Sequence, residues 1–121
     1  MTKRILVIKD TEDNRQILRD LLTAAGFDLI EAVDGESGVA MAKAHTPDLI
    51  LMDIQLPVID GYEATRRIKA DPALAHIPVI AVTSYALSGD EEKTRAAGCN
   101  GYIAKPFSPR QLLSKVREFV G

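Results

Sequence analysis

Four polar residues stand at or just beyond the ends of short apolar runs in this sequence. They are Asp10, Asp53, Thr83 and Lys105. Two carboxylates, a hydroxyl and an ammonium group are the side chains that phosphoryl transfer to an aspartate requires. One carboxylate acts as the nucleophile, a divalent cation neutralises the developing charge, and the hydroxyl and the lysine hold the phosphoryl oxygens. The residue types therefore indicate this chemistry if the fold brings them together.

Each of these residues has a plainer interpretation when it is taken alone. An aspartate after a strand often caps a helix or a turn, and a lysine before a proline, as at Lys105, is usually just exposed. The functional interpretation therefore depends on the elements that carry the four residues.

Apolar runs and segments of helical period alternate five times along the chain. Continuous aliphatic runs are typical of parallel strands that are covered on both faces. Short connections and right-handed crossovers then favour a doubly wound α/β fold with helices on both faces of a five-stranded parallel sheet. The predicted strands are 5–8, 28–32, 49–52, 79–82 and 101–104, and the predicted helices are about 17–25, 36–45, 62–70, 90–97 and 112–120.

The strand order decides whether the polar residues meet. With the flavodoxin-like order 2-1-3-4-5, the carboxyl ends of the strands form one crevice, and the four residues converge on it. The first predicted helix should cover the sheet with one apolar face. That face is made of Ile17, Leu18, Leu21, Leu22 and Ala25.

The composition predicts one globular domain over residues 1–121. A formal net charge of -2 without a basic stripe argues against nucleic-acid binding. The apolar run at 5–8 is too short for a signal peptide or a membrane span. The single cysteine, Cys99, is interpreted as a small packed residue in a reducing compartment. We therefore expect a cytoplasmic protein that binds neither nucleic acid nor membrane.

Five segments carry a resemblance to a known family. They are Lys9-Asp10 after the first strand, Pro47-Asp48-Leu49-Ile50-Leu51-Met52-Asp53-Ile54-Gln55-Leu56-Pro57, Asp60-Gly61, Val82-Thr83-Ser84 and Gly101-Tyr102-Ile103-Ala104-Lys105-Pro106-Phe107. Over nearly its whole length the chain resembles the receiver domains of two-component response regulators, and the combination of motifs is very specific. The resemblance implies a flavodoxin-like receiver in a phosphorelay.

The resemblance also implies roles for the polar residues. Asp53 would accept a phosphoryl group from a histidine kinase or a phosphotransfer protein, and Lys105 would pair with it. Mg²⁺ would be held by Asp10, Asp53 and the backbone carbonyl of Gln55. Thr83 would hydrogen-bond the phosphoryl group. These roles imply that the chain is a signalling phosphoprotein and not an enzyme that turns over substrate.

Tyr102 would be an aromatic rotamer switch coupled to Thr83 by the same resemblance. From the residues alone, a tyrosine in an edge strand is more often simply half-buried. Without an output domain in the sequence, the signal would pass to a downstream protein target, and a homodimer is left open.

Lys9 departs from the family pattern, which usually has two acidic residues after the first strand. Its ammonium group could salt-bridge Asp53 or Asp10 and substitute partly for Mg²⁺. Alternatively, its flexible four-carbon stem carries the charge into solvent and the site works weakly but normally. The sequence leaves both alternatives open.

Two other functions compete with the phosphorylated switch. In one, the chain is a receiver-like interaction module in which Lys9 makes Mg²⁺ and phosphorylation weak or dispensable. In the other it is a small enzyme, but an aspartyl-phosphate phosphatase would want a carboxylate where Gln55 stands, and no phosphate-binding glycine motif occurs. The phosphorylated switch is therefore preferred.

Overall fold

The computed structural model of the chain describes residues 2–83, 90–104 and 107–120. Within these residues, five strands and five helices alternate along the chain. The strands are β1 (Arg4–Ile8), β2 (Asp28–Ala32), β3 (Leu49–Asp53), β4 (Val79–Thr83) and β5 (Gly101–Ala104). The helices are α1 (Glu12–Ala24), α2 (Gly35–His45), α3 (Gly61–Ala70), α4 (Asp90–Ala97) and α5 (Pro109–Val120).

All neighbouring strands are parallel, and their order is β2-β1-β3-β4-β5, which confirms the predicted doubly wound fold. The register pairs Ile8 with Met52 and Asp53 with Val82. The carboxyl ends of β1, β3 and β4 are therefore level with one another, which is the condition for a shared site at this edge.

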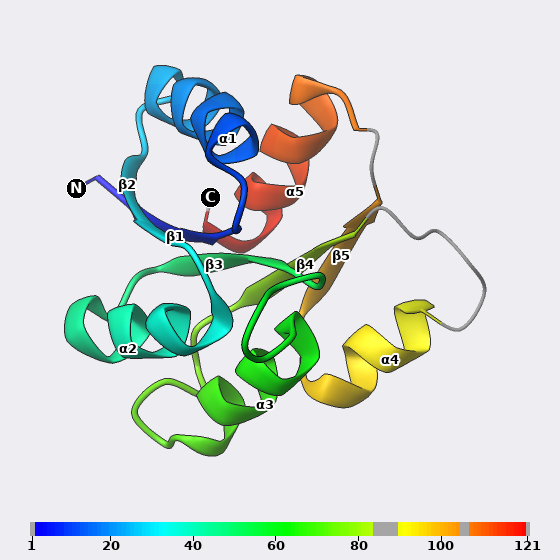
Figure 1. Ribbon diagram of the computed structural model, residues 1–121. Coiled ribbons are helices and arrows are strands. Elements are labelled where there is room, and N and C mark those ends of the chain that lie inside the picture. Colours follow the sequence, from blue (N-terminus) through cyan, green and yellow to red (C-terminus); the bar gives the residue numbers. More distant parts are fainter. Residues whose placement is uncertain (1, 84–89, 105–106, 121) are drawn as a thin grey trace.

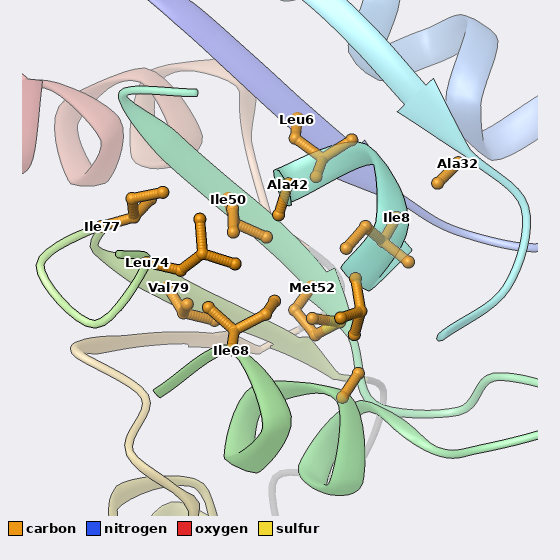
Figure 2. Packing of buried hydrophobic residues seen from close by; sticks show 12 residues of the cluster. Leu6, Ile8, Ala32, Ala42, Ile50, Met52, Ile68, Leu74, Ile77 and Val79 are labelled. Atoms are coloured by element: carbon orange, nitrogen blue, oxygen red, sulfur yellow. The ribbon is translucent and has the colours of Figure 1, made fainter. Parts of the chain in front are cut away.

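Helices α1 and α5 cover one face of the sheet, and α2, α3 and α4 cover the other (Figure 1). Side chains alternate along each central strand, so β1 sends Leu6 and Ile8 to the α2–α3 side and Ile5 and Val7 to the α1–α5 side. Figure 2 shows the first of these two clusters, in which Ile68 of α3 packs with strand residues. Because both faces are packed, the three central strands are rigid supports for the polar residues at their carboxyl ends.

Helix starts near the carboxyl edge have local causes in the sequence. Asp34 caps α2 by accepting a hydrogen bond from the backbone N–H of Ser37 at 2.7 Å, and this bond holds the pKa of Asp34 below its usual range. Asp60 caps α3 by accepting a hydrogen bond from the backbone N–H of Glu63 at 2.9 Å.

None of the described helices is long and apolar enough to cross a membrane.

The predicted apolar face of α1 needs one correction. Ile17 is 62% exposed, whereas Leu18 and Leu22 are buried against the sheet. The buried stripe of the helix includes Arg15, which lies one turn before Leu18 and is also buried. The prediction was wrong at Ile17 because the apolar residues spread too widely around the helix for all of them to face the sheet.

Candidate active site

Asp53 is the last residue of β3, and only 6% of it is exposed. Its two carboxylate oxygens have different partners. Oδ1 accepts a hydrogen bond from the backbone N–H of Gln55 at 3.2 Å, and Oδ2 lies 3.7 Å from the Nζ atom of Lys9. A buried carboxylate needs such partners because taking a charge out of water is costly. Asp53 is therefore a buried, charge-paired carboxylate at the carboxyl edge of the sheet.

Lys9 follows β1 directly, and its side chain is only 3% exposed. Its backbone N–H donates to the carbonyl of Ala32 at 3.1 Å, which extends the pairing of β1 with β2 by one residue. The side chain consequently points toward the end of β3 and forms the ion pair with Asp53. Of the two alternatives that the sequence left open, the structure has the ion pair and not the solvated ammonium group.

Asp10 is exposed and accepts a hydrogen bond from the hydroxyl of Thr11 at 3.3 Å. A cavity of about 470 Å³ opens beside it and is lined in part by Gln55 and Thr83. The cavity brings together three predicted site residues that are far apart in the sequence. It is large enough to admit a small anionic group to this edge of the sheet.

Gly61 lets α3 begin directly against the end of β3. A Cβ atom at this position would lie 2.4 Å from the carbonyl oxygen of Asp53 and 2.7 Å from the Cα atom of Ile54. The N–H of Gly61 instead donates to the carbonyl of Ile54 at 2.9 Å. In the sequence, Gly61 is only one member of a motif, and this close approach gives its physical reason.

The predicted switch residues lie on adjacent strands. Thr83 ends β4 and is 3% exposed, whereas Tyr102 is half-buried in the edge strand β5, opposite Ala81. Thr83 pairs with Ala104, so Tyr102 lies two residues before the position opposite Thr83. Lys105, which was predicted to pair with the phosphoryl group, lies outside the described residues.

The donor chemistry around Asp53 suits a hard cation such as Mg²⁺, which prefers carboxylate and carbonyl oxygens. Asp10, Asp53 and the carbonyl of Gln55 supply such atoms. In the part of the chain that the structure describes, no three His, Cys, Asp or Glu side chains gather to hold a metal ion. Two carboxylates are present, and a third side chain at this edge, Lys9, is a cation. The oxygen atoms are therefore of the type that Mg²⁺ prefers, but the ammonium group of Lys9 beside them would compete with the ion for the carboxylates.

Arg15 was not predicted as a site residue from the sequence. Its Nη1 atom donates a hydrogen bond to the backbone carbonyl of Lys9 at 2.8 Å. The signal that could have found it is a charged residue on the buried stripe of α1, one turn before Leu18. A buried arginine requires specific partners because its charge is costly to remove from water.

Comparison with known proteins places the chain in context. The family model of the response regulator receiver domain matches residues 5–117. The chain is 45% identical to the polar-differentiation response regulator DivK of Brucella ovis over 121 residues, which cover 100% of this chain and 98% of that protein.

Solved structures agree with this match. The receiver domain of a sensor histidine kinase from Pseudomonas aeruginosa superposes with a TM-score of 0.93 at 37% identity, covering 100% of this chain and 99% of that one, and it holds a magnesium ion in its active-site cleft. A chemotaxis response regulator of Vibrio cholerae gives a TM-score of 0.93 at 25% identity over 98% of this chain and 99% of that one. The chain therefore belongs to the response regulator receiver domain family of two-component signalling.

Proposed function

We propose that this receiver domain accepts a phosphoryl group on Asp53 from a histidine kinase or a phosphotransfer protein and signals through altered binding of a downstream protein. The observation that carries the proposal is the position of Asp53. It is buried at the carboxyl edge with a cation on Oδ2, and Asp10 and Thr83 line a cavity at the same edge. A cytoplasmic location suits such an exchange between proteins.

In this reaction a carboxylate oxygen of Asp53 attacks the phosphorus atom of a phosphohistidine. The new O–P bond forms as the N–P bond breaks, and the bonding electrons return to the imidazole of the donor. Mg²⁺, when bound, neutralises charge on the phosphoryl oxygens. Asp10, Asp53 and the backbone carbonyl of Gln55 would hold it, and Lys105 and the hydroxyl of Thr83 would hold the phosphoryl oxygens.

Lys9 should make the binding of Mg²⁺ weaker than a carboxylate at this position would. Two unit charges about 4 Å apart interact by roughly 4 kcal/mol at an effective dielectric constant of about 20. Even a third of this energy corresponds to about tenfold in affinity. Lys9→Glu is therefore expected to tighten Mg²⁺ binding about tenfold or more, measured by titration calorimetry. An unchanged affinity would reject this role for Lys9.

The downstream signal would depend on Thr83 and Tyr102. A phosphoryl group adds about two negative charges and strong hydrogen-bond acceptors close to Thr83. If Thr83 moves toward it, Tyr102 can change rotamer, and the phosphate biases two existing states. Thr83→Ala removes one group that would hold the phosphoryl oxygens but keeps the nucleophile Asp53 and Lys105. Phosphorylation should therefore stay largely intact, while the amide shifts around Tyr102 stop responding to beryllium fluoride. A full response in the variant would contradict the coupling.

The direct test is incubation with acetyl phosphate and Mg²⁺, followed by intact mass measurement. We expect an adduct of one phosphoryl group on the wild-type protein and none on Asp53→Asn. Asp48→Asn is the matched control because Asp48 is exposed just before β3, at the opposite end of that strand. Wild-type protein without an adduct at saturating Mg²⁺, or an adduct retained by Asp53→Asn, would overturn the proposal.

A further inference from the structure

We infer that Arg15 is the positioning residue of the site: its guanidinium group fixes the peptide that carries Lys9 and Asp10, and thereby places both side chains relative to Asp53. The effect on phosphoryl transfer rests on the function proposed above. The effect on the geometry of the loop between β1 and α1 does not.

Arg15 connects three elements from a buried position on α1. It is 9% exposed, and Nη1 donates to the backbone carbonyl of Lys9 at 2.8 Å. Nε lies 3.3 Å from Oε1 of Glu31 on β2, and Nη2 donates to the carboxylate of Glu12 in the first turn of α1. One planar group thus joins the end of β1, the end of β2 and the start of α1, which a guanidinium with five fixed donors can do.

The Lys9 residue is held on both sides of its Cα atom. Its N–H donates to Ala32, and its carbonyl accepts from Arg15. The first bond continues the sheet, and the second replaces the strand pairing that ends there. The conformation of this backbone sets the direction of the Lys9 side chain and the position of Asp10. The distance of 3.7 Å between Nζ of Lys9 and Oδ2 of Asp53 therefore depends on it as well.

Without the guanidinium group, the Lys9 carbonyl would lose its buried donor, which costs more than an exposed hydrogen bond. The peptide would then turn to find water or another donor. A displacement of about 1 Å at a reacting site can lower a rate by about a hundredfold, and loss of a group that orients metal ligands typically costs 10- to 100-fold, as an order of magnitude.

Arg19 offers a matched control on the same helix. Nε of Arg19 donates to Glu31 at 2.7 Å, and Nη2 donates to Glu12 at 3.0 Å. It therefore shares both glutamates with Arg15, but its side chain is 39% exposed. Among the hydrogen bonds of the described residues, the bond to the Lys9 carbonyl is made by Arg15 and not by Arg19. A variant of Arg19 therefore removes comparable ion pairs to the two glutamates but keeps the hydrogen bond from Arg15 to the Lys9 carbonyl.

The experiment compares Arg15→Gln, Arg15→Lys and Arg19→Gln with the wild-type protein, each shown to be folded by its thermal transition. We expect Arg15→Gln to speed amide hydrogen exchange at Lys9 and Asp10, to weaken Mg²⁺ binding and to slow acetyl phosphate labelling, each by about tenfold or more. Arg19→Gln should stay within about twofold of wild type in all three. Arg15→Lys, which keeps a cationic hydrogen-bond donor but not the planar guanidinium group, should recover part of the loss.

Equal effects of Arg15→Gln and Arg19→Gln would overturn the inference, as would normal exchange at Lys9 and Asp10 in Arg15→Gln. If Arg15→Gln does not fold, the same comparison is made between Arg15→Lys and Arg19→Lys, with a smaller expected difference in the same direction. Wild-type protein that takes no phosphoryl group would contradict the proposed function alone, because hydrogen exchange still decides the role of Arg15.

Discussion

Lys9 is buried at the carboxyl end of the central sheet and Lys69 of α3 is half-buried near the sheet's amino end, and the two ammonium groups have different partners. At the carboxyl end, Nζ of Lys9 lies 3.7 Å from a carboxylate oxygen of Asp53. At the amino end, Nζ of Lys69 donates to the carbonyls of Ala75 and Ile77 at 3.1 and 2.7 Å. Burial lowers the pKa of Lys69 below its usual range, because the carbonyls are dipoles and carry no compensating charge.

This difference in partners suggests different roles: Lys9 belongs to the candidate site, whereas Lys69 has a structural role. The neutral carbonyls that bind Lys69 belong to the segment between α3 and β4, so these hydrogen bonds tie that segment to α3. Under the proposed function, by contrast, the carboxylate of Asp53 would bind a second cation or carry a phosphoryl group, and either change would alter its ion pair with Lys9. Paired variants at the two ends of the sheet should therefore differ in stability and in reactivity.

The largest expected effect comes from removing each lysine. Lys9→Met should lower the free energy of unfolding by about 3 kcal/mol in metal-free buffer, because it leaves a buried carboxylate without this partner. Lys69→Met should cost about 1 kcal/mol, since it removes hydrogen bonds to neutral groups. Urea denaturation with a chelator measures both. A larger loss for Lys69→Met would invert the comparison.

A smaller effect is expected from the glycine next to each lysine site. Gly61→Ala should cost about 2 kcal/mol and slow labelling of Asp53, because the new methyl group meets backbone atoms of Asp53 and Ile54. Gly98→Ala should cost about 1 kcal/mol through its positive φ of 106°. There the three atoms nearest to the new methyl group belong to the side chain of Lys69, with Cγ at 2.8 Å, and no backbone atom is among them.

Acetyl phosphate labelling distinguishes the two glycine variants at equal folded fraction. Gly98→Ala should label at the wild-type rate because it lies at the amino end. Slow labelling of that variant, or normal labelling of Gly61→Ala, would show that the close approach at Gly61 does not position Asp53.

The smallest effect concerns Cys99, whose thiol lies 3.7 Å from the hydroxyl of Thr65. Burial raises the pKa of Cys99 above its usual 9.0, and the charge of Lys69 opposes this rise. Since the thiolate is the reactive form, alkylation by iodoacetamide should be slow at pH 8 and accelerate beyond pH 9. Lys69→Met should raise the pKa further and slow alkylation at pH 8 about twofold. Lys9→Met should leave the rate unchanged; equal slowing by both variants would argue against a local effect.

The strands were well predicted because their signal is local. Each predicted strand begins and ends within one residue of the structure, from 28–32 in β2 to 101–104 in β5. The helix starts were less accurate, since α1 begins at Glu12 and α5 at Pro109, earlier than the apolar period indicates. First turns are polar and exposed, so hydrophobic spacing does not report them.

For the candidate site residues, the sequence indicated that several would lie near one another, but it did not indicate which side chains would contact each other. The convergence of Asp10, Gln55 and Thr83 follows from strand order alone. The direction of the Lys9 side chain does not, because a four-carbon stem has many rotamers and only the surrounding backbone selects one. The contact of Arg15 was not predictable either, since its partner is a backbone carbonyl six residues earlier in the chain, and no residue type marks such a partner.

The ion pair between Lys9 and Asp53 also bears on how a phosphorylated donor approaches. With Lys9 in place of a carboxylate, the charge at this edge of the sheet is more positive by two units. Phosphodonors are anions, and like charges slow diffusional encounter most when few salt ions screen them, at Debye lengths of about 30 Å in 0.01 M salt against about 8 Å at physiological ionic strength. Before any metal binds, encounter of this protein with the proposed phosphodonor should therefore depend less on ionic strength than encounter of the Lys9→Glu variant with the same donor.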